Sequence, residues 1–111
     1  MKLAIVGSRN LSVENINDYI PEEMEIDEII SGGARGIDAC AKKFALENNV
    51  AYTEILPDYK RYSRGAPIIR NREIVERADH VLILWDGASR GTKSVIDYCK
   101  DIGKPFSVFE L

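Results

Sequence analysis

The chain has 111 residues, of which 45% are hydrophobic and 30% are charged, and its formal net charge is −3. This composition is ordinary for a folded protein and excludes a disordered or collagen-like chain, so we expect a single domain over residues 1–111. The apolar runs are too short to span a bilayer and no signal-peptide pattern is present, which predicts a cytoplasmic protein without membrane contact.

Apolar runs and helical periodicity alternate along the chain. Five runs without polar alternation predict buried strands at residues 3–6, 26–31, 50–56, 81–85 and 105–109. Between them, capping and spacing predict a short helix between Ser12 and Pro21, and helices at residues 36–48, 69–78 and 92–102. Such an order predicts a parallel sheet covered on both faces. The expected fold is α/β, a Rossmann-like three-layer α/β/α domain whose five-stranded parallel sheet has the order 3-2-1-4-5.

The segment Ser31-Gly32-Gly33-Ala34-Arg35-Gly36-Ile37-Asp38 joins the second strand to the following helix. Its glycines allow the backbone to approach a ligand closely, and the free N–H groups at a helix N-terminus favour a phosphate. Arg35 is a natural bidentate partner for that phosphate, and a surface ion pair is its alternative role. Asp38, on the first helical turn, accepts either from a ribose hydroxyl or from Arg9, or it only compensates the charge of the helix N-terminus.

Further polar segments are expected at the same edge of the sheet. In a doubly wound sheet, ligands bind outside the carboxyl ends of the strands where the strand order reverses, here between strands 1 and 4. Arg70 is expected to face this crevice in preference to Arg72, because residues two apart point to different sides of a helix. The polar stretch 57–67, with Tyr59 and Tyr62 as possible stacking residues, is a candidate functional loop. The remaining candidate ligand-binding residues are Gly7, Ser8, Arg9, Asn71, Asp86, Gly87, Ser89, Arg90, Gly91 and Thr92. Asp86 either holds a hydroxyl of the ligand or is an ordinary turn residue.

Other polar residues are interpreted as structural. Cys40 and Cys99 are widely separated and lack CxxC spacing, and His80 precedes a strand at the end opposite the expected crevice. No metal or cofactor is predicted. Residues 14–28 contain seven acids and no base, which is typical of a solvated face, whereas residues 57–77 contain six bases against three acids.

The motifs Gly7-Ser8-Arg9, Ser31 to Asp38 and Arg70-Asn71-Arg72, in this order, resemble the Rossmann-like domain of the DNA-processing protein DprA (Smf). More broadly, the chain resembles the SLOG superfamily, which includes the LOG phosphoribohydrolases and small stand-alone YpsA-like and DUF2493-type proteins. The resemblance covers nearly the whole chain, and the size fits the stand-alone branch best. It implies a homodimer.

The leading functional interpretation is binding of a nucleotide or nucleotide-derived ligand, for sensing, sequestering or carrying it. The first alternative is a LOG-type nucleotide N-glycosidase or phosphoribohydrolase. Of the LOG signature PGGxGTxxE, only Gly91-Thr92 matches, and Val95 stands at the glutamate position, so Asp38 or Asp86 would have to act as the catalytic acid. A further alternative is a DprA-like module that binds single-stranded DNA, which the acidic net charge disfavours.

Overall fold

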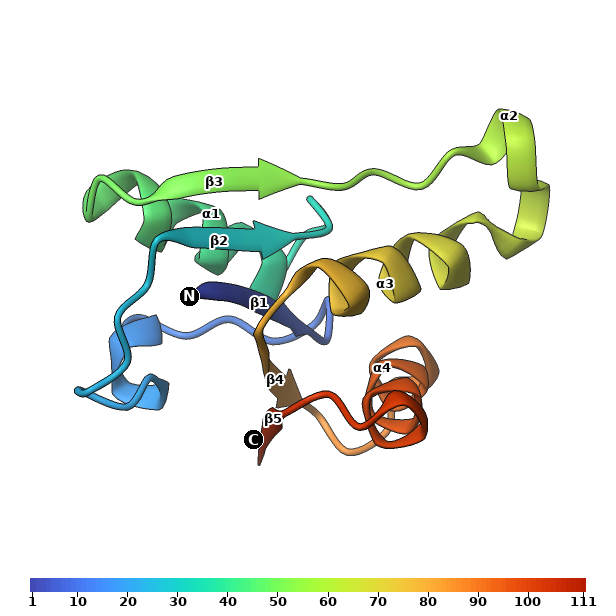
Figure 1. Ribbon diagram of the computed structural model, residues 1–111. Helices are drawn as coiled ribbons and strands as arrows, with labels where there is room; N and C mark the ends of the chain where they lie inside the picture. Colours follow the sequence, from blue (N-terminus) through green and yellow to red (C-terminus); the bar gives the residue numbers. More distant parts are fainter.

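In the computed structural model, which describes residues 1–111, five strands form one sheet in which all neighbours are parallel. The strand order is β3-β2-β1-β4-β5, as Figure 1 shows. The predicted fold class and strand order are therefore confirmed. The strands are β1 (Lys2–Gly7), β2 (Glu28–Ser31), β3 (Ala51–Glu54), β4 (His80–Trp85) and β5 (Phe106–Glu110).

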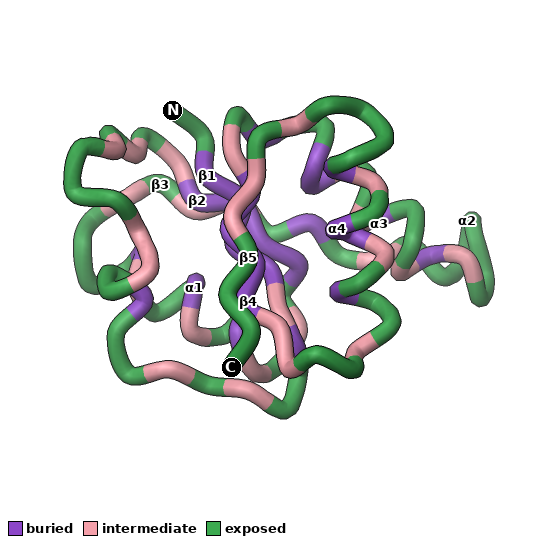
Figure 2. The backbone as a smooth tube through the Cα atoms, turned by 90° about the horizontal axis from the view of Figure 1, so that it is seen from below, coloured by how far each residue is buried: buried purple, intermediate pink, exposed green.

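Helices cover both faces of the sheet. The short 3₁₀ helix η1 (Ile16–Tyr19) and α1 (Ile37–Glu47) pack on one face, and α3 (Ala66–Arg77) and α4 (Arg90–Ile102) pack on the other. Figure 2 shows the buried residues concentrated on the central strands between these two layers. No helix has both the length and the apolar character needed to cross a membrane.

The central strands have continuous apolar sequences because each of their faces has a helix layer to pack against. In β1, Leu3 and Ile5 join the core beneath α1, while Ala4 and Val6 join the core beneath α3 and α4. Alternate residues of a strand point to opposite faces, so a strand buried on both sides has no polar position. This pattern made the central strands predictable from the sequence.

The elements around the sheet depart further from the predictions. The first predicted helix is only the single turn η1, and the predicted functional loop contains two short helices, α2 (Tyr59–Tyr62) and η2 (Ser63–Gly65). The side chain of Asp58 caps α2 by accepting from the Arg61 N–H at 3.2 Å. This helix has no buried residue, so it lacks the apolar periodicity on which its prediction would depend. α3 begins at Ala66, with proline in its first turn, three residues before the predicted start.

The residues interpreted as structural occupy structural positions. The His80 ring lies 2.9 Å from the Ser107 hydroxyl on the neighbouring strand β5. Cys99 is fully buried in the core beneath α4, and Cys40 is half-buried on α1. No group of three or more His, Cys, Asp or Glu residues is arranged to hold a metal ion.

Candidate functional site

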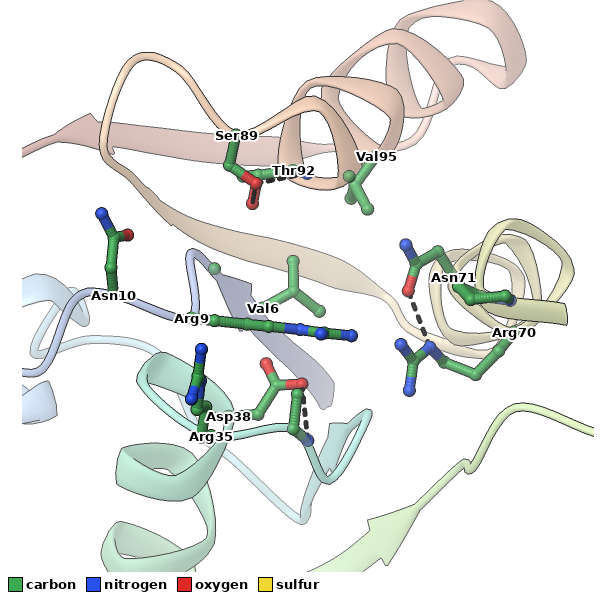
Figure 3. A pocket seen from close by; sticks show the side chains of 14 residues that line it. Val6, Arg9, Asn10, Arg35, Asp38, Arg70, Asn71, Ser89, Thr92 and Val95 are labelled. Atoms are coloured by element: carbon green, nitrogen blue, oxygen red, sulfur yellow. Dashed lines mark hydrogen bonds between the residues drawn. The ribbon is translucent and has the colours of Figure 1, made fainter. Parts of the chain in front are cut away.

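A cavity of about 410 Å³ lies at the carboxyl edge of the sheet, where the loops after β1, β2 and β4 meet the first half of α3. β1 and β4 are neighbours whose chain connections run in opposite directions, so this edge is the switch point at which a site was expected. Figure 3 shows side chains from all four segments around this cavity. It is lined by Val6, Gly7, Arg9, Asn10, Ala34, Arg35, Asp38, Pro67, Arg70, Asn71, Ser89, Gly91, Thr92 and Val95.

The N-terminus of α1 opens onto the cavity. Gly36 caps this helix with a φ of 77°, and no side chain caps it. The first helical hydrogen bond of α1 runs from the Cys40 N–H to the Gly36 carbonyl at 3.1 Å. The N–H groups of Asp38 and Ala39 have no acceptor in the protein. Free N–H groups together with the positive end of the helix dipole favour an anion here.

The N-terminus of α4 faces the same cavity. Its cap is Ser89, whose hydroxyl oxygen accepts from the Thr92 N–H at 3.4 Å and from the Thr92 hydroxyl at 3.2 Å. The N–H groups of Arg90 and Gly91 have no acceptor in the protein. A side chain at Gly91 would meet no atom within 4 Å, so a ligand can approach the backbone closely at this position. Two helix N-termini therefore converge on one cavity.

Three arginines line the cavity, and they fall into two groups. The side chains of Arg9 and Arg35 are exposed and make no hydrogen bond or salt bridge with the protein. Arg70 is only 8% exposed, and its Nη1 donates to the Gly32 carbonyl at 2.7 Å and to the Ile55 carbonyl at 3.4 Å. Arg70 therefore holds the glycine loop in place, while Arg9 and Arg35 are free to bind an anion.

The surroundings of Arg70 modify its pKa without removing its charge. Burial lowers the pKa of the guanidinium, the Asp38 carboxylate opposes this shift, and the positive charge of Arg9 adds to the lowering. The Arg70 Nε also donates to the Asn71 side-chain oxygen at 2.8 Å. An arginine remains protonated in such a setting because its reference pKa is so high. Arg70 therefore keeps its positive charge at neutral pH.

Asp38 is the one carboxylate that lines the cavity. Its side chain is 6% exposed, and Oδ2 accepts from the Ala34 N–H at 3.2 Å. Its other oxygen, Oδ1, is buried without a hydrogen-bond partner. Burial raises the pKa of Asp38, against the lowering effects of the Ala34 N–H, Arg70, the Ser31 hydroxyl and the Gly32 N–H.

Several predicted site residues support the loops from behind the cavity. Ser31 donates its hydroxyl to the Ile5 carbonyl at 2.7 Å. Ser8 is 1% exposed, and its oxygen accepts from the Asp86 N–H at 3.1 Å, which ties the loop after β4 to the end of β1. Asp86 accepts from the N–H groups of Ser89 at 2.7 Å and Ala88 at 2.9 Å. These bonds lower the pKa of Asp86 and make it a turn residue that does not line the cavity.

The glycines of the loop 31–38 are crowded by the protein itself, at Gly32 and Gly33 by the ends of flexible side chains and at Gly36 by backbone atoms. A Cβ at Gly32 would lie 2.7 Å from Nη1 of Arg70, one at Gly33 would lie 2.6 Å from the Glu54 side chain, and one at Gly36 would lie 2.5 Å from the Arg9 carbonyl oxygen. None of these three glycines lines the cavity. They shape the loop that presents Ala34, Arg35 and Asp38, whereas close approach to a ligand was the role expected from the sequence.

Two further predictions concern residues at the margin. Arg70 faces the cavity and Arg72 lies over the Tyr98 ring, 5.2 Å from its centroid, as the helical spacing predicted. Gly87 and Arg90 do not line the cavity, whereas Asn10 and Pro67 do, although they were not predicted. Their positions gave a usable signal: Asn10 directly follows Arg9, and proline is favoured in the first turn of a helix, here the one that carries Arg70.

The sheet order, the helix layers and a ligand-sized cavity at the switch point define a Rossmann-like α/β domain. Comparison with protein families identifies it further. The model of the family described as DNA recombination-mediator protein A matches residues 1–59, more than half of the chain, and the protein belongs to this family. The match includes β1 and the glycine loop and ends before α3. Searches of curated proteins and of solved structures gave no significant match.

Proposed function

We propose that the cavity binds the phosphate of a nucleotide unit and that this unit belongs to single-stranded DNA. The observation that carries the proposal is the convergence of two uncapped or partly capped helix N-termini and two unpaired arginines on one cavity. Free N–H groups and guanidinium groups are the donors that proteins use for phosphates. Membership of the DNA recombination-mediator protein A family favours single-stranded DNA as the source of the phosphate.

The segment 58–65, which we call the arm, favours a polynucleotide over a free nucleotide. The arm comprises α2 and η2 and projects from the body of the domain next to the start of α3 (Figure 1). Tyr59 is 57% exposed and Tyr62 is 36% exposed. Exposed aromatic side chains next to positively charged side chains are the usual means of binding several nucleotides in a row, because the rings stack on the nucleobases and the charges attract the phosphates. The exposed, positively charged residues of the arm are Lys60, Arg61 and Arg64.

The acidic segment 14–28 does not oppose this proposal, because it lies at the amino ends of the strands, opposite the cavity. It contains η1 and leads into the start of β2, whereas the cavity lies at the carboxyl ends of the strands (Figure 1). The two edges are separated by the length of β1, about 20 Å at 3.3 Å per residue. The Debye length at physiological ionic strength is about 8 Å, so these acids act weakly on the cavity.

The test measures the affinity for an oligothymidylate, by fluorescence anisotropy, as a function of salt. Arg9→Ala and Arg35→Ala should each weaken binding by about tenfold or more and lessen the salt dependence, because each removes a charged phosphate contact. Arg77→Ala is the matched control, since Arg77 lies at the far end of α3 and pairs with Glu73 at 3.0 Å. Equal losses in all three variants would reduce the proposal to general charge attraction.

Tyr59→Ala tests the arm separately. Loss of one base-stacking contact should weaken oligonucleotide binding by about fivefold or more and leave the binding of a mononucleotide unchanged. A second candidate function, binding of a free nucleotide, is favoured by the cavity volume of about 410 Å³, which suits a small-molecule ligand. If mononucleotides bind as tightly as the oligonucleotide and Tyr59→Ala has no effect, the second candidate replaces the first.

Hydrolysis is not proposed. Val95 lines the cavity at the position of the glutamate in the LOG signature, so no carboxylate is available there. Asp86, one of the two acids considered from the sequence, is held by the N–H groups of its own loop. Asp38, the other acid, does line the cavity, but it is the one carboxylate there and has no second acid beside it. We therefore expect the wild-type protein to release no free base from a panel of nucleoside monophosphates.

A further inference from the structure

Asp38 places an unpaired negative oxygen inside a cavity that otherwise favours anions. Its side chain is more than nine-tenths buried, and only Oδ2 has a partner, the Ala34 N–H. Figure 3 shows the carboxylate directed into the cavity, beside Arg9 and above the start of α1. A buried polar atom without a partner costs free energy, so Oδ1 has a strong tendency to accept a hydrogen bond from a ligand.

The residues around Asp38 do not supply that bond. Ser31 donates its hydroxyl to the Ile5 carbonyl, and Arg70 donates to the Gly32 and Ile55 carbonyls and to Asn71. Asp38 forms no salt bridge with Arg9 or with Arg70. The Arg9 side chain extends beside the carboxylate and has no partner of its own, so it is free to move toward a phosphate and expose Oδ1.

A carboxylate also restricts which anion suits the cavity. It repels a bare phosphate, so an occupant gains most if it carries a hydrogen-bond donor next to its phosphate. In a nucleotide, that donor is a free sugar hydroxyl. The sugars of internal DNA nucleotides have none, because both hydroxyls are esterified, whereas the terminal nucleotide keeps one.

Resting on the proposed binding of single-stranded DNA, we propose that Asp38 accepts a hydrogen bond from the free sugar hydroxyl of a terminal nucleotide, so that the cavity selects strand ends. The two helix N-termini and the two unpaired arginines hold the terminal phosphate. Asp38 distinguishes an end from the interior of the strand. The arm then contacts the nucleotides that follow.

The experiment compares a linear oligothymidylate with a covalently closed circle of the same length, both labelled on an internal base. Thymine offers only one ring N–H donor, which limits competition from the bases. The wild-type protein should bind the linear strand about tenfold more tightly, the effect of one hydrogen bond to a charged acceptor. Linear strands ending in a 3′-dideoxynucleotide or in a 5′-phosphate then identify which terminal hydroxyl is recognised.

Asp38→Asn keeps an oxygen for the Ala34 N–H and replaces the free carboxylate oxygen by an amide NH₂. In this variant the ratio of linear to circular affinity should fall to about one, whereas Asp101→Asn, the same change on an exposed residue at the end of α4, should keep the wild-type ratio. If the wild-type protein bound the linear strand and the closed circle with equal affinity, the role of Asp38 would be overturned and the proposed function would remain intact. No binding of either DNA would overturn the proposed function itself.

Discussion

Replacing Gly36 with alanine tests whether the glycine loop is shaped by the protein's own packing. Gly36 has φ 77° and ψ −128°, a conformation that costs an L-residue about 1–3 kcal/mol. Its Cβ would also lie 2.5 Å from the carbonyl oxygen of Arg9 and 2.6 Å from that of Ser8. These are backbone atoms, which cannot move aside as a flexible side chain can. Forced contacts of this kind cost about 1–3 kcal/mol more.

The two effects together should lower the free energy of unfolding by about 2–6 kcal/mol, a large part of the about 5–15 kcal/mol of a typical domain. Urea unfolding followed by the fluorescence of Trp85, the only tryptophan, measures this change. Trp85 is a suitable reporter because its Nε1 donates to the Ser89 carbonyl at 3.1 Å, in the loop that opens α4.

Gly91→Ala is the matched control, because the same added methyl group meets nothing within 4 Å. Gly91 lies in the first turn of α4, where alanine should leave stability unchanged or raise it by up to about 1 kcal/mol. The methyl group nevertheless projects into the proposed phosphate site, so oligonucleotide affinity should fall. If Gly36→Ala were as stable as the wild type, our account of the loop would be wrong. If Gly91→Ala bound DNA normally, the N-terminus of α4 would not contact the ligand.

Three further predictions follow from buried polar groups. Arg70→Met leaves the Gly32 carbonyl without its donor and should lower the free energy of unfolding by about 1–3 kcal/mol, measured by urea unfolding. An unchanged free energy of unfolding would mean that the hydrogen bond from Arg70 to the Gly32 carbonyl does not stabilise the fold. Because burial raises the pKa of Asp38, the folded state favours its protonated form, so the contribution of Asp38 to the free energy of unfolding should decrease as the pH rises above about 4. The free energy of unfolding of the wild type relative to that of Asp38→Asn should therefore fall over this range, and parallel pH profiles of the two proteins would contradict this assignment. Burial raises the pKa of the Cys99 thiol to about 11, so iodoacetamide at pH 8 should modify half-buried Cys40 in the native protein and Cys99 only after unfolding, as mass spectrometry can detect.

The sequence was most informative where one residue pattern had one structural solution. Apolar runs such as Leu3–Val6 needed two covered faces, and this requirement led to the parallel sheet and its order. The arm was less predictable, because α2 buries no residue and so has no periodicity. A helix cap at Asp58, stabilised by the Arg61 N–H, is visible in the structure and is only one of several turns that the sequence allows.

The candidate site was predictable as a location and much less so as a set of roles. Arg35 and Arg70 have the same chemistry in the sequence, yet Arg35 is exposed and Arg70 is 8% exposed. The difference arises from tertiary structure, because α3 carries Arg70 against carbonyl groups at positions 32 and 55 that are distant in sequence. For Asp86, the sequence left a hydroxyl acceptor and an ordinary turn residue equally open, and in the structure the N–H groups of its own loop are its donors.

The division of labour among the arginines has a consequence for binding. Arg70 donates a hydrogen bond to the Gly32 carbonyl, and Asp38 accepts one from the Ala34 N–H. Together, one cation and one carboxylate hold the loop before α1. A loop that is already ordered loses little conformational freedom when a ligand arrives, so more of the interaction free energy appears as affinity. The donors left over for a ligand, on Arg9, on Arg35 and at two helix N-termini, are then presented around a rigid frame. Weakening that frame through Arg70 should therefore lower DNA affinity even though the guanidinium of Arg70 is already engaged by the protein.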